Sequence, residues 1–268
     1  MQTTSALFKQ IWSNPNHWSE VKVNINGVDY FESNLMSVSI QTDVFGDNKL
    51  TIGSAPVGSC RVELIVDNME GIDLSDLIPR GSKIIIYERI HGTVFTPVDC
   101  IVGEAVVGQA VAGGTATARD ETSEWLIQGT FYVDYRDTYS TSGVLTLDGL
   151  DIMAKADIMF PSTEFQWDSA PDNGILGVIA GKMGVAIDPT TLGIVRGFYQ
   201  IPLPVNYTMR EVLGYIAALY CGNFVITKDE KLLLLQYDSL PETTSYLITE
   251  DGDRLIIGLG DKECYIIV

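Results

Sequence analysis

Residues 207–237 constrain the fold of this chain most, because they carry a helix start, a helical periodicity and a helix stop in one run. Thr208 and Glu211 stand three apart and predict a capping box, in which each side chain satisfies a backbone N–H group. Apolar residues that include Leu213 and Ile216 then recur at the three-to-four spacing of a helix with one buried face. Gly222 is expected to supply the positive φ that ends this helix.

A β-hairpin is predicted directly after this helix. Residues 224–227 and 232–237 are β-prone runs, and the polar residues 228–231 between them are turn-like. We expect Leu213 and Ile216 to pack against the hairpin at Phe224 and at Leu233 or Leu234. This stretch contains no plausible reactive group, so its predicted role is to build a small α+β layer.

The first half of the chain is predicted to be rich in strands. Residues 21–25 alternate apolar and polar side chains, and Asn26-Gly27 is a strong signal for a hairpin turn. Further strands are expected at residues 35–42, 60–66, 83–90, 125–134 and 144–150, with residues 95–102 as a partner of 83–90. Residues 104–124 are rich in small side chains and Gly-Gly, which predicts a projecting loop.

These patterns predict an α+β protein with two domains, which a chain of 268 residues is long enough to form. Residues 1–150 would form a β-rich, barrel-like domain. Residues 151–240 would form a small α+β domain with the capped helix packed on its hairpin. Residues 241–268 read as terminal strands, which either return to the first domain or begin another.

The charge and hydropathy of the chain exclude several classes of partner. The formal net charge is -18, from 35 acidic and 17 basic residues, and the basic residues form no cluster. Sequence-independent nucleic-acid binding needs a basic footprint, so we expect none. No apolar run approaches the roughly 20 residues of a membrane span, and the N-terminus shows no secretory signal.

No catalytic, cofactor or metal residue is predicted. The two histidines, His17 and His91, have no histidine or cysteine at ligand spacing, and no hydrolase or nucleotide-binding motif occurs. The carboxylate pairs read as solvated turns rather than cation sites, and no aromatic ladder of the sugar-binding kind is apparent. The cysteines show no CxxC pair, which favours reduced thiols; they are Cys60, Cys100, Cys221 and Cys264.

Several stretches, in order, resemble the tail-hub proteins of bacteriophages and prophages, which form the baseplate hub or tail-tip ring. A hairpin strand and extended run, VKVNINGVDYFESNLMSVSIQTD, precede FGDNKLTIGSAPVGSCRVELIV, which is similar to the family's Ile-Gly loop and here contains Gly53. The segments KIIIYERI, WLIQGTFYVDYR and VLTLDGLDIMAKAD follow. The helix and hairpin in TMREVLGYIAALYCGNFVITKDEKLLLLQY complete the resemblance.

The resemblance implies a non-enzymatic virion protein whose copies form a homo-oligomeric ring. It also implies that the ring binds other tail or baseplate proteins. In such a ring, tube-like β domains surround a channel through which DNA can pass. The protein would be assembled in the host bacterial cytoplasm and would belong to the virion tail. The turn at 228–231 lacks the glycine of the family, and residues 104–124 look like an insertion. The sequence ends on a strand sooner than a hub with two complete tube domains would, so we expect the second tube domain to be incomplete or missing.

Two alternatives stay open at this point. One is a tail-associated cell-wall hydrolase that uses carboxylates or Cys221, and the other is a carbohydrate-binding surface module.

Overall fold

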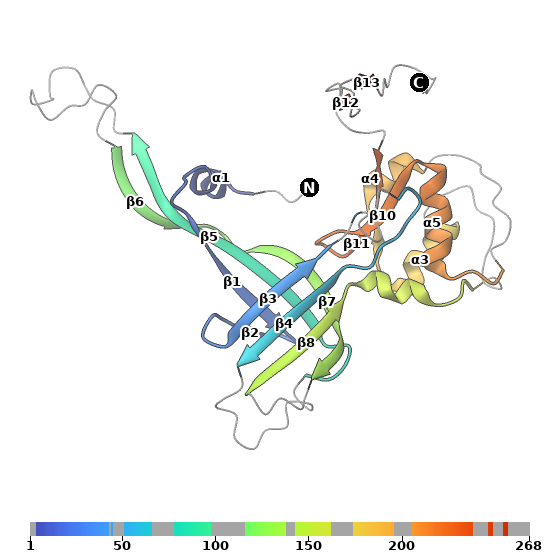
Figure 1. The fold of residues 1–268 in the computed structure, drawn as a ribbon, viewed down its shortest axis with the longest axis horizontal. Coiled ribbons are helices and arrows are strands. Elements are labelled where there is room, and N and C mark those ends of the chain that lie inside the picture. Colours follow the sequence, from blue (N-terminus) through green and yellow to red (C-terminus); the bar gives the residue numbers. More distant parts are fainter. Residues whose placement is uncertain are drawn as a thin grey trace, which may run out of the picture. The chain divides into compact units, whose positions relative to one another are not determined.

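The structure is a computed structural model that describes residues 4–42, 44, 51–65, 78–97, 116–137, 143–161, 174–195, 205–237, 246–248 and 254–256. It is a mixed α+β fold with a strand-rich antiparallel sheet (Figure 1), as predicted. The chain divides into two compact units. Unit 1 comprises Met1–Thr42 and Gly58–Asp151, and unit 2 comprises Asp43–Val57 and Ile152–Val268.

Unit 1 contains one helix and an eight-stranded sheet. The helix α1 spans Ala6–Trp12. The strands are β1 (Trp18–Ile25), β2 (Val28–Tyr30), β3 (Leu35–Gln41), β4 (Ser59–Ile65), β5 (Lys83–Pro97), β6 (Ala116–Thr122), β7 (Leu126–Asp137) and β8 (Val144–Leu150). Their order is β2-β1-β5-β7-β8-β4-β3, with β6 paired to β5, and every pairing is antiparallel.

The predicted barrel-like closure of this sheet is not confirmed. The strand order begins with β2 and ends with β3, and the described residues contain no ladder between these two strands. The segment that joins them turns tightly instead, because the Leu35 N–H donates to the Phe31 carbonyl at 3.0 Å. Val23 of β1 and Val62 of β4 share one buried cluster although their strands lie far apart in the order. The sheet therefore wraps around its core but stays open between β2 and β3.

The predicted projecting loop at residues 104–124 is wrong for residues 116–122. Residues 116–122 form strand β6, which pairs with the second half of β5 from His91↔Thr122 to Pro97↔Ala116. Residues 95–97 thus continue β5 and are not part of a separate partner strand. The remaining residues, 98–115, lie outside the described part of the chain. A long-range ladder can hold Ala- and Thr-rich sequence in a strand even where burial per residue is small.

Unit 2 gathers its helices around a small sheet. It contains the 3-10 helix η2 (Ile152–Asp157), the helices α3 (Ile175–Met183), α4 (Pro189–Ile194) and α5 (Met209–Leu219), and the strands β9 (Ala186–Ile187), β10 (Gly222–Ile226) and β11 (Lys231–Gln236). The sheet order is β10-β11-β9, with β10 antiparallel and β9 parallel to β11. Two further strands, β12 (Tyr246–Ile248) and β13 (Arg254–Ile256), pair with each other.

The helix start and the helix packing predicted for residues 207–237 are both present. The Glu211 N–H donates to the Thr208 hydroxyl at 3.2 Å, and the Thr208 N–H donates to the Glu211 carboxylate at 2.7 Å, which confirms the capping box. Leu213 and Ile216 are buried in one cluster with Phe224 and Leu234.

The predicted role of Gly222 in ending α5 is wrong. Cys221 takes the positive φ, at 49°, just after the capping residue Tyr220, while Gly222 already belongs to β10. Gly222 is needed for another reason, because a Cβ atom there would lie 2.3 Å from the Leu235 carbonyl oxygen of the partner strand β11. The glycine therefore permits close strand contact rather than an unusual backbone angle.

Residues from the Asp43–Val57 segment are built into unit 2 by backbone contacts. Gly53 has φ +84°, and its N–H donates to the Gly222 carbonyl at 2.9 Å. A Cβ at Gly53 would lie 2.7 Å from the Ala218 Cβ, so this glycine allows the segment to pass directly over α5. The segment therefore packs with residues that follow it by about 160 positions in the chain.

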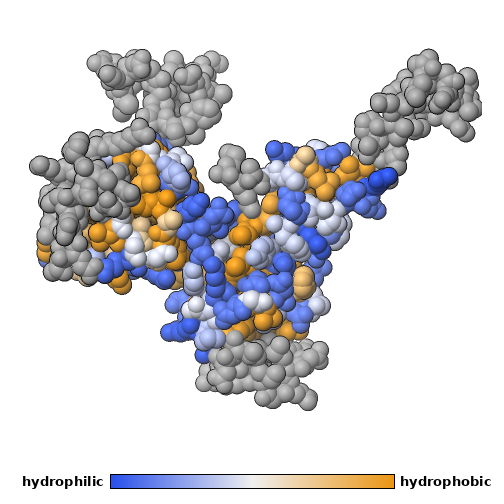
Figure 2. All heavy atoms as spheres, turned by 180° about the vertical axis from the view of Figure 1, so that it is seen from behind, coloured by the Kyte–Doolittle hydropathy of each residue, from blue (hydrophilic) through white to orange (hydrophobic). Residues whose placement is uncertain are grey.

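Some large apolar side chains reach the surface, as Figure 2 shows for one face of the molecule. They include Trp12, Trp18, Met36, Ile40, Tyr135, Ile158, Met159, Tyr207, Tyr215 and Leu219. No helix in the described part of the chain is both long and apolar enough to cross a membrane.

Candidate functional site

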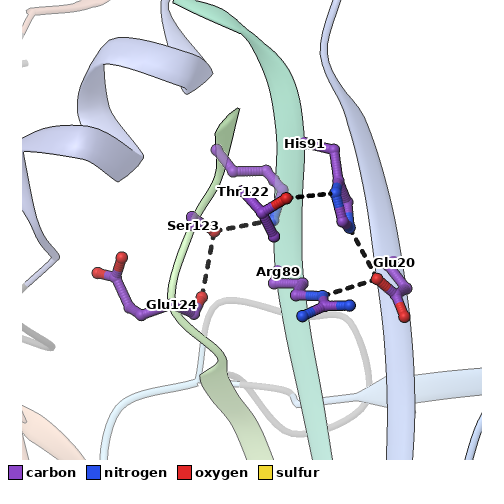
Figure 3. Close-up of polar contacts among 7 residues, drawn as sticks. Glu20, Arg89, His91, Thr122, Ser123 and Glu124 are labelled. Atoms are coloured by element: carbon purple, nitrogen blue, oxygen red, sulfur yellow. Dashed lines mark hydrogen bonds and ion pairs between the residues drawn. The ribbon is translucent and has the colours of Figure 1, made fainter. Parts of the chain in front are cut away.

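The most concentrated group of interacting polar side chains lies on strands β1 and β5 of unit 1, on the face turned away from the core (Figure 3). Antiparallel pairing places Trp18 opposite His91, Glu20 opposite Arg89, and Lys22 opposite Tyr87. The intervening residues of β1, such as Val21 and Val23, pack against the core. Side chains two positions apart on a strand share a face, so these three pairs form one row. We call it the outer ladder.

Glu20 is the centre of the outer ladder. Its Oε2 atom accepts a hydrogen bond from Arg89 Nε at 2.7 Å and another from His91 Nε2 at 2.7 Å. Because a carboxylate only accepts, His91 Nε2 carries the proton of its bond to Glu20, and His91 Nδ1 lies 2.9 Å from the Thr122 hydroxyl oxygen. The ladder thereby ties β1 and β5 to the end of β6, as Figure 3 shows.

The corner between β6 and β7 continues this network. The Ser123 hydroxyl accepts from the Ile90 N–H at 2.9 Å and donates to the Glu124 carbonyl at 3.1 Å. The Glu124 carboxylate accepts from both the N–H group and the hydroxyl of Ser5, which is the N-cap of α1. The corner therefore anchors the start of the N-terminal helix.

Aromatic rings cover both ends of the outer ladder. The Trp18 ring stacks on the His91 ring at a centroid distance of 4.0 Å and an interplanar angle of 7°. At the other end, the Arg89 guanidinium lies 4.3 Å from the Trp125 ring centre, and Lys22 Nζ lies 5.0 Å from it. Trp18 is 55% exposed, so the ring face that does not contact His91 is open to solvent.

The electrostatics of the outer ladder favour the charged form of Glu20. The hydrogen bond from Arg89 does most to hold the pKa of Glu20 below its usual range, and the bond from His91 also lowers this pKa. Burial acts in the opposite direction and raises the pKa. Glu124 behaves similarly, because its bonds from the Ser5 hydroxyl and N–H lower its pKa. The ladder is thus centred on the ion pair between Glu20 and Arg89.

The structural residues singled out from the sequence all lie in unit 2, away from the outer ladder in the chain. Thr208 and Glu211 cap α5, Leu213 and Ile216 fill its core, and Gly53 and Gly222 allow close backbone contacts. The most important residue that the sequence did not reveal there is Asn223, which is fully buried. Its Oδ1 accepts from the Ser54 N–H at 2.9 Å, and its Nδ2 lies 2.7 Å from both the Val44 and Thr51 carbonyls.

Several other ionisable groups in the described residues are paired or buried, whereas Cys221 is a free and exposed thiol. Asp148 binds Arg61 through both carboxylate oxygens, and Asp151 accepts from the Gly58 N–H at 2.8 Å. Burial raises the pKa of the Cys60 thiol to about 12, which keeps it protonated. The described residues hold no group of three or more side chains suited to a metal ion.

Each unit contains a hollow among its described residues. The hollow in unit 1, of about 400 Å³, is lined by Arg61 and Asp148, which bind each other. The hollow in unit 2, of about 570 Å³, lies beside the first turn of α5, where Arg210 pairs with Asp157. Each hollow therefore contains an ion pair formed within the chain, and each also has a further carboxylate in its lining, Asp134 in unit 1 and Glu211 in unit 2.

Two segments of the sequence carry a signal for the outer ladder, although the ladder was not predicted from them. WSEVK and YERIH each place an aromatic or ionisable residue at every other position, and the antiparallel register sets these residues opposite each other. The aromatic residues lie far apart along the chain, which is why no aromatic cluster was predicted from the sequence.

No family model and no curated protein matches the sequence. Among solved structures, the chain is similar to the crystal structure of the 43 kDa tail protein of prophage MuSo2 from Shewanella oneidensis, with 14% identity and a TM-score of 0.47. The match covers 87% of this chain and 58% of that protein, so the chain spans less than two thirds of the length of its structural neighbour.

Proposed function

We propose that the chain is a non-enzymatic structural component of a phage or prophage tail, similar to a hub or baseplate protein. It joins other copies of itself in a ring at the tail tip. The ordered sequence resemblance between Val21 and Tyr237 supports this role. Its partners are then other tail or baseplate proteins, and its site of action is the virion tail after assembly in the bacterial cytoplasm.

The observation that carries the proposal is the open edge of the sheet in unit 1. Strand β3 pairs with β4 on one side, and the described residues supply no strand on its other side. Such an edge is a template for pairing with another chain. It also carries apolar side chains, since Met36 is 62% exposed and Ile40 is 36% exposed. Pairing between copies would extend the sheet around a ring and cover these groups.

The charge of the chain sets the conditions for assembly. Each copy brings a formal charge of -18, so neighbouring copies repel one another at low salt. At about 0.15 M ionic strength the screening length is roughly 8 Å, and added salt weakens this repulsion while leaving apolar contacts intact. Oligomers should therefore persist or strengthen as salt rises. DNA should pass through the ring without binding to it, because duplex DNA binding needs basic contacts.

The substitution Met36→Lys tests this proposal. It places a charge on the open edge while Met36 remains exposed, so the fold should survive and assembly should weaken. Met159→Lys is the matched control, because Met159 is 57% exposed and lies in unit 2. Size-exclusion chromatography with light scattering, at low and high salt, measures the mass of each variant.

We expect oligomers for the wild type and for Met159→Lys, and a shift toward monomer for Met36→Lys. A wild-type protein that stays monomeric at high concentration in both salts contradicts the ring. Equal oligomers in all three proteins contradict the assignment of the interface to β3. Release of fragments from a cell-wall preparation would show instead that the protein is a hydrolase.

A further inference from the structure

The outer ladder has hydrogen-bonding groups left over that its internal contacts do not use. Both bonds to Glu20 end on Oε2, so Oε1 accepts none from the described residues. Arg89 donates through Nε alone, so within the described chain its two terminal nitrogens make no hydrogen bond. The side chain of Arg89 is 29% exposed and that of Glu20 is 17% exposed, so solvent reaches both.

These groups stand beside an aromatic platform. Glu20 lies two residues along β1 from Trp18, on the same face of the strand, at a separation of about 7 Å between equivalent atoms. His91 holds the Trp18 ring from behind, and Trp125 holds the Arg89 guanidinium plane. Both side chains are therefore positioned before any ligand arrives, which reduces the entropy lost on binding.

We propose that the outer ladder is a binding site for a neutral oligosaccharide. The apolar face of a sugar ring stacks on the open face of Trp18. Neighbouring hydroxyl groups donate to Glu20 Oε1 and accept from the terminal nitrogens of Arg89. A hydroxyl group can both donate and accept, so it satisfies a carboxylate and a guanidinium at the same site.

The charges of the ladder select against other ligand classes. The charge of Glu20 is balanced by that of Arg89, and the charge of Lys22 is balanced by that of Asp29 at 2.9 Å, so these two ion pairs leave no net charge. A simple anion would meet the Glu20 carboxylate, and a simple cation would meet Arg89. Nucleic acid needs several unpaired basic groups along a groove, and the cations of this ladder are already paired. A neutral polyhydroxylated ligand has the matching chemistry.

The inference does not rest on the proposed tail function, because it concerns one face of unit 1 in any assembly state. Its test is retention of the full chain on an array of neutral and acidic oligosaccharides. Binding of soluble maltohexaose and of a hexamer of N-acetylglucosamine is then measured by titration. The variants are Trp18→Ala and Arg89→Lys, and the matched control is Tyr135→Ala, since Tyr135 is 50% exposed in the same unit.

We expect the wild type and Tyr135→Ala to retain neutral oligosaccharides with similar affinity. Trp18→Ala should abolish retention. Arg89→Lys keeps the charge but loses the two terminal donors of the guanidinium, so affinity should fall about tenfold to a hundredfold. Thermal melts of each variant separate loss of binding from loss of the fold, and a variant that has unfolded is replaced by Glu20→Gln.

Three results overturn the proposal. The first is that the wild-type protein retains no neutral glycan. The second is that wild type, Trp18→Ala and Arg89→Lys retain neutral glycans equally, and the third is that the wild type prefers acidic glycans. A protein partner that binds this face would appear as the first of these results, because no sugar would then be retained.

Discussion

The two units build their cores from contacts of very different range in the chain. In unit 2, helix α5 packs on the hairpin of β10 and β11, which follows it within about 20 residues. In unit 1, β4 pairs with β8, although residues 59–65 and 144–150 lie far apart in the sequence. Local signals were therefore sufficient for the centre of unit 2, whereas the sheet of unit 1 depends on pairings that no short stretch encodes.

The cores are also separate from each other. The buried cluster around Ile216 contains only residues of unit 2, and the buried cluster around Ile86 contains only residues of unit 1. A substitution in one cluster should thus act mainly on its own unit.

The largest expected effect comes from a matched pair of core truncations. Ile216→Ala in unit 2 and Ile86→Ala in unit 1 each remove a buried side chain and should each cost about 2–5 kcal/mol of unfolding free energy. Hydrogen exchange of amides in β11 and β5 during denaturant titration reports the units individually. Equal loss of protection in both units, whichever residue is changed, would show that the units unfold together. A loss below about 0.5 kcal/mol for Ile216→Ala would contradict the packing of α5 on its hairpin.

The next effect concerns Asn223, which links a distant segment to unit 2. Asn223→Ala leaves the half-buried Ser54 N–H and Val44 carbonyl without this partner, at a cost of up to about 1–3 kcal/mol each, whereas the exposed Thr51 can bond to water instead. The Ser54 amide should lose its protection from hydrogen exchange first. Asn24→Ala, which removes two exposed hydrogen bonds in unit 1, is the control and should change stability less. Equal effects of the two substitutions would refute the anchoring role of Asn223.

A smaller effect distinguishes the two residues that follow α5. Gly222→Ala should destabilise unit 2 by about 1–3 kcal/mol, because the added Cβ meets the Leu235 carbonyl. Cys221→Gly should stay within about 1 kcal/mol of wild type, since relief of the positive φ offsets the added freedom of the unfolded chain. Thermal melts of both variants provide the comparison. A larger loss of stability for Cys221→Gly than for Gly222→Ala would contradict this assignment of the two residues.

The smallest effect is a pH dependence in unit 1. The folded-state pKa of Glu20 is lowered, chiefly by Arg89, so ionised Glu20 stabilises the fold above the usual carboxyl pKa of 4.5. This stability is lost as the pH falls from there through the lowered pKa. Glu20→Gln should therefore be less stable than wild type near pH 7, and the difference should shrink in acid. A difference that is constant from pH 7 to pH 3 would show that the ladder acts by packing alone.

Comparison of the predictions with the structure shows where local sequence is informative. The capping box at Thr208 and Glu211 and the turn at Asn26-Gly27 were both predicted, and the structure has positive φ at both turn residues. Such features depend on residues within about four positions of each other, so the side-chain chemistry at those positions decides them. The burial of Leu213 and Ile216 follows from the same helical periodicity.

Only the tertiary structure decided the rest. The strand β6, the open edge at β3, the hydrogen bonds of Asn223 to Val44, Thr51 and Ser54, and the outer ladder around Glu20 all depend on positions that are distant in the chain. The tertiary structure also decided that Cys221, and not Gly222, takes the positive φ after α5. The close approach of the Leu235 carbonyl requires a residue without a Cβ at position 222. Register between distant strands is set by the combined burial of many side chains, which the alternation within any one strand does not specify.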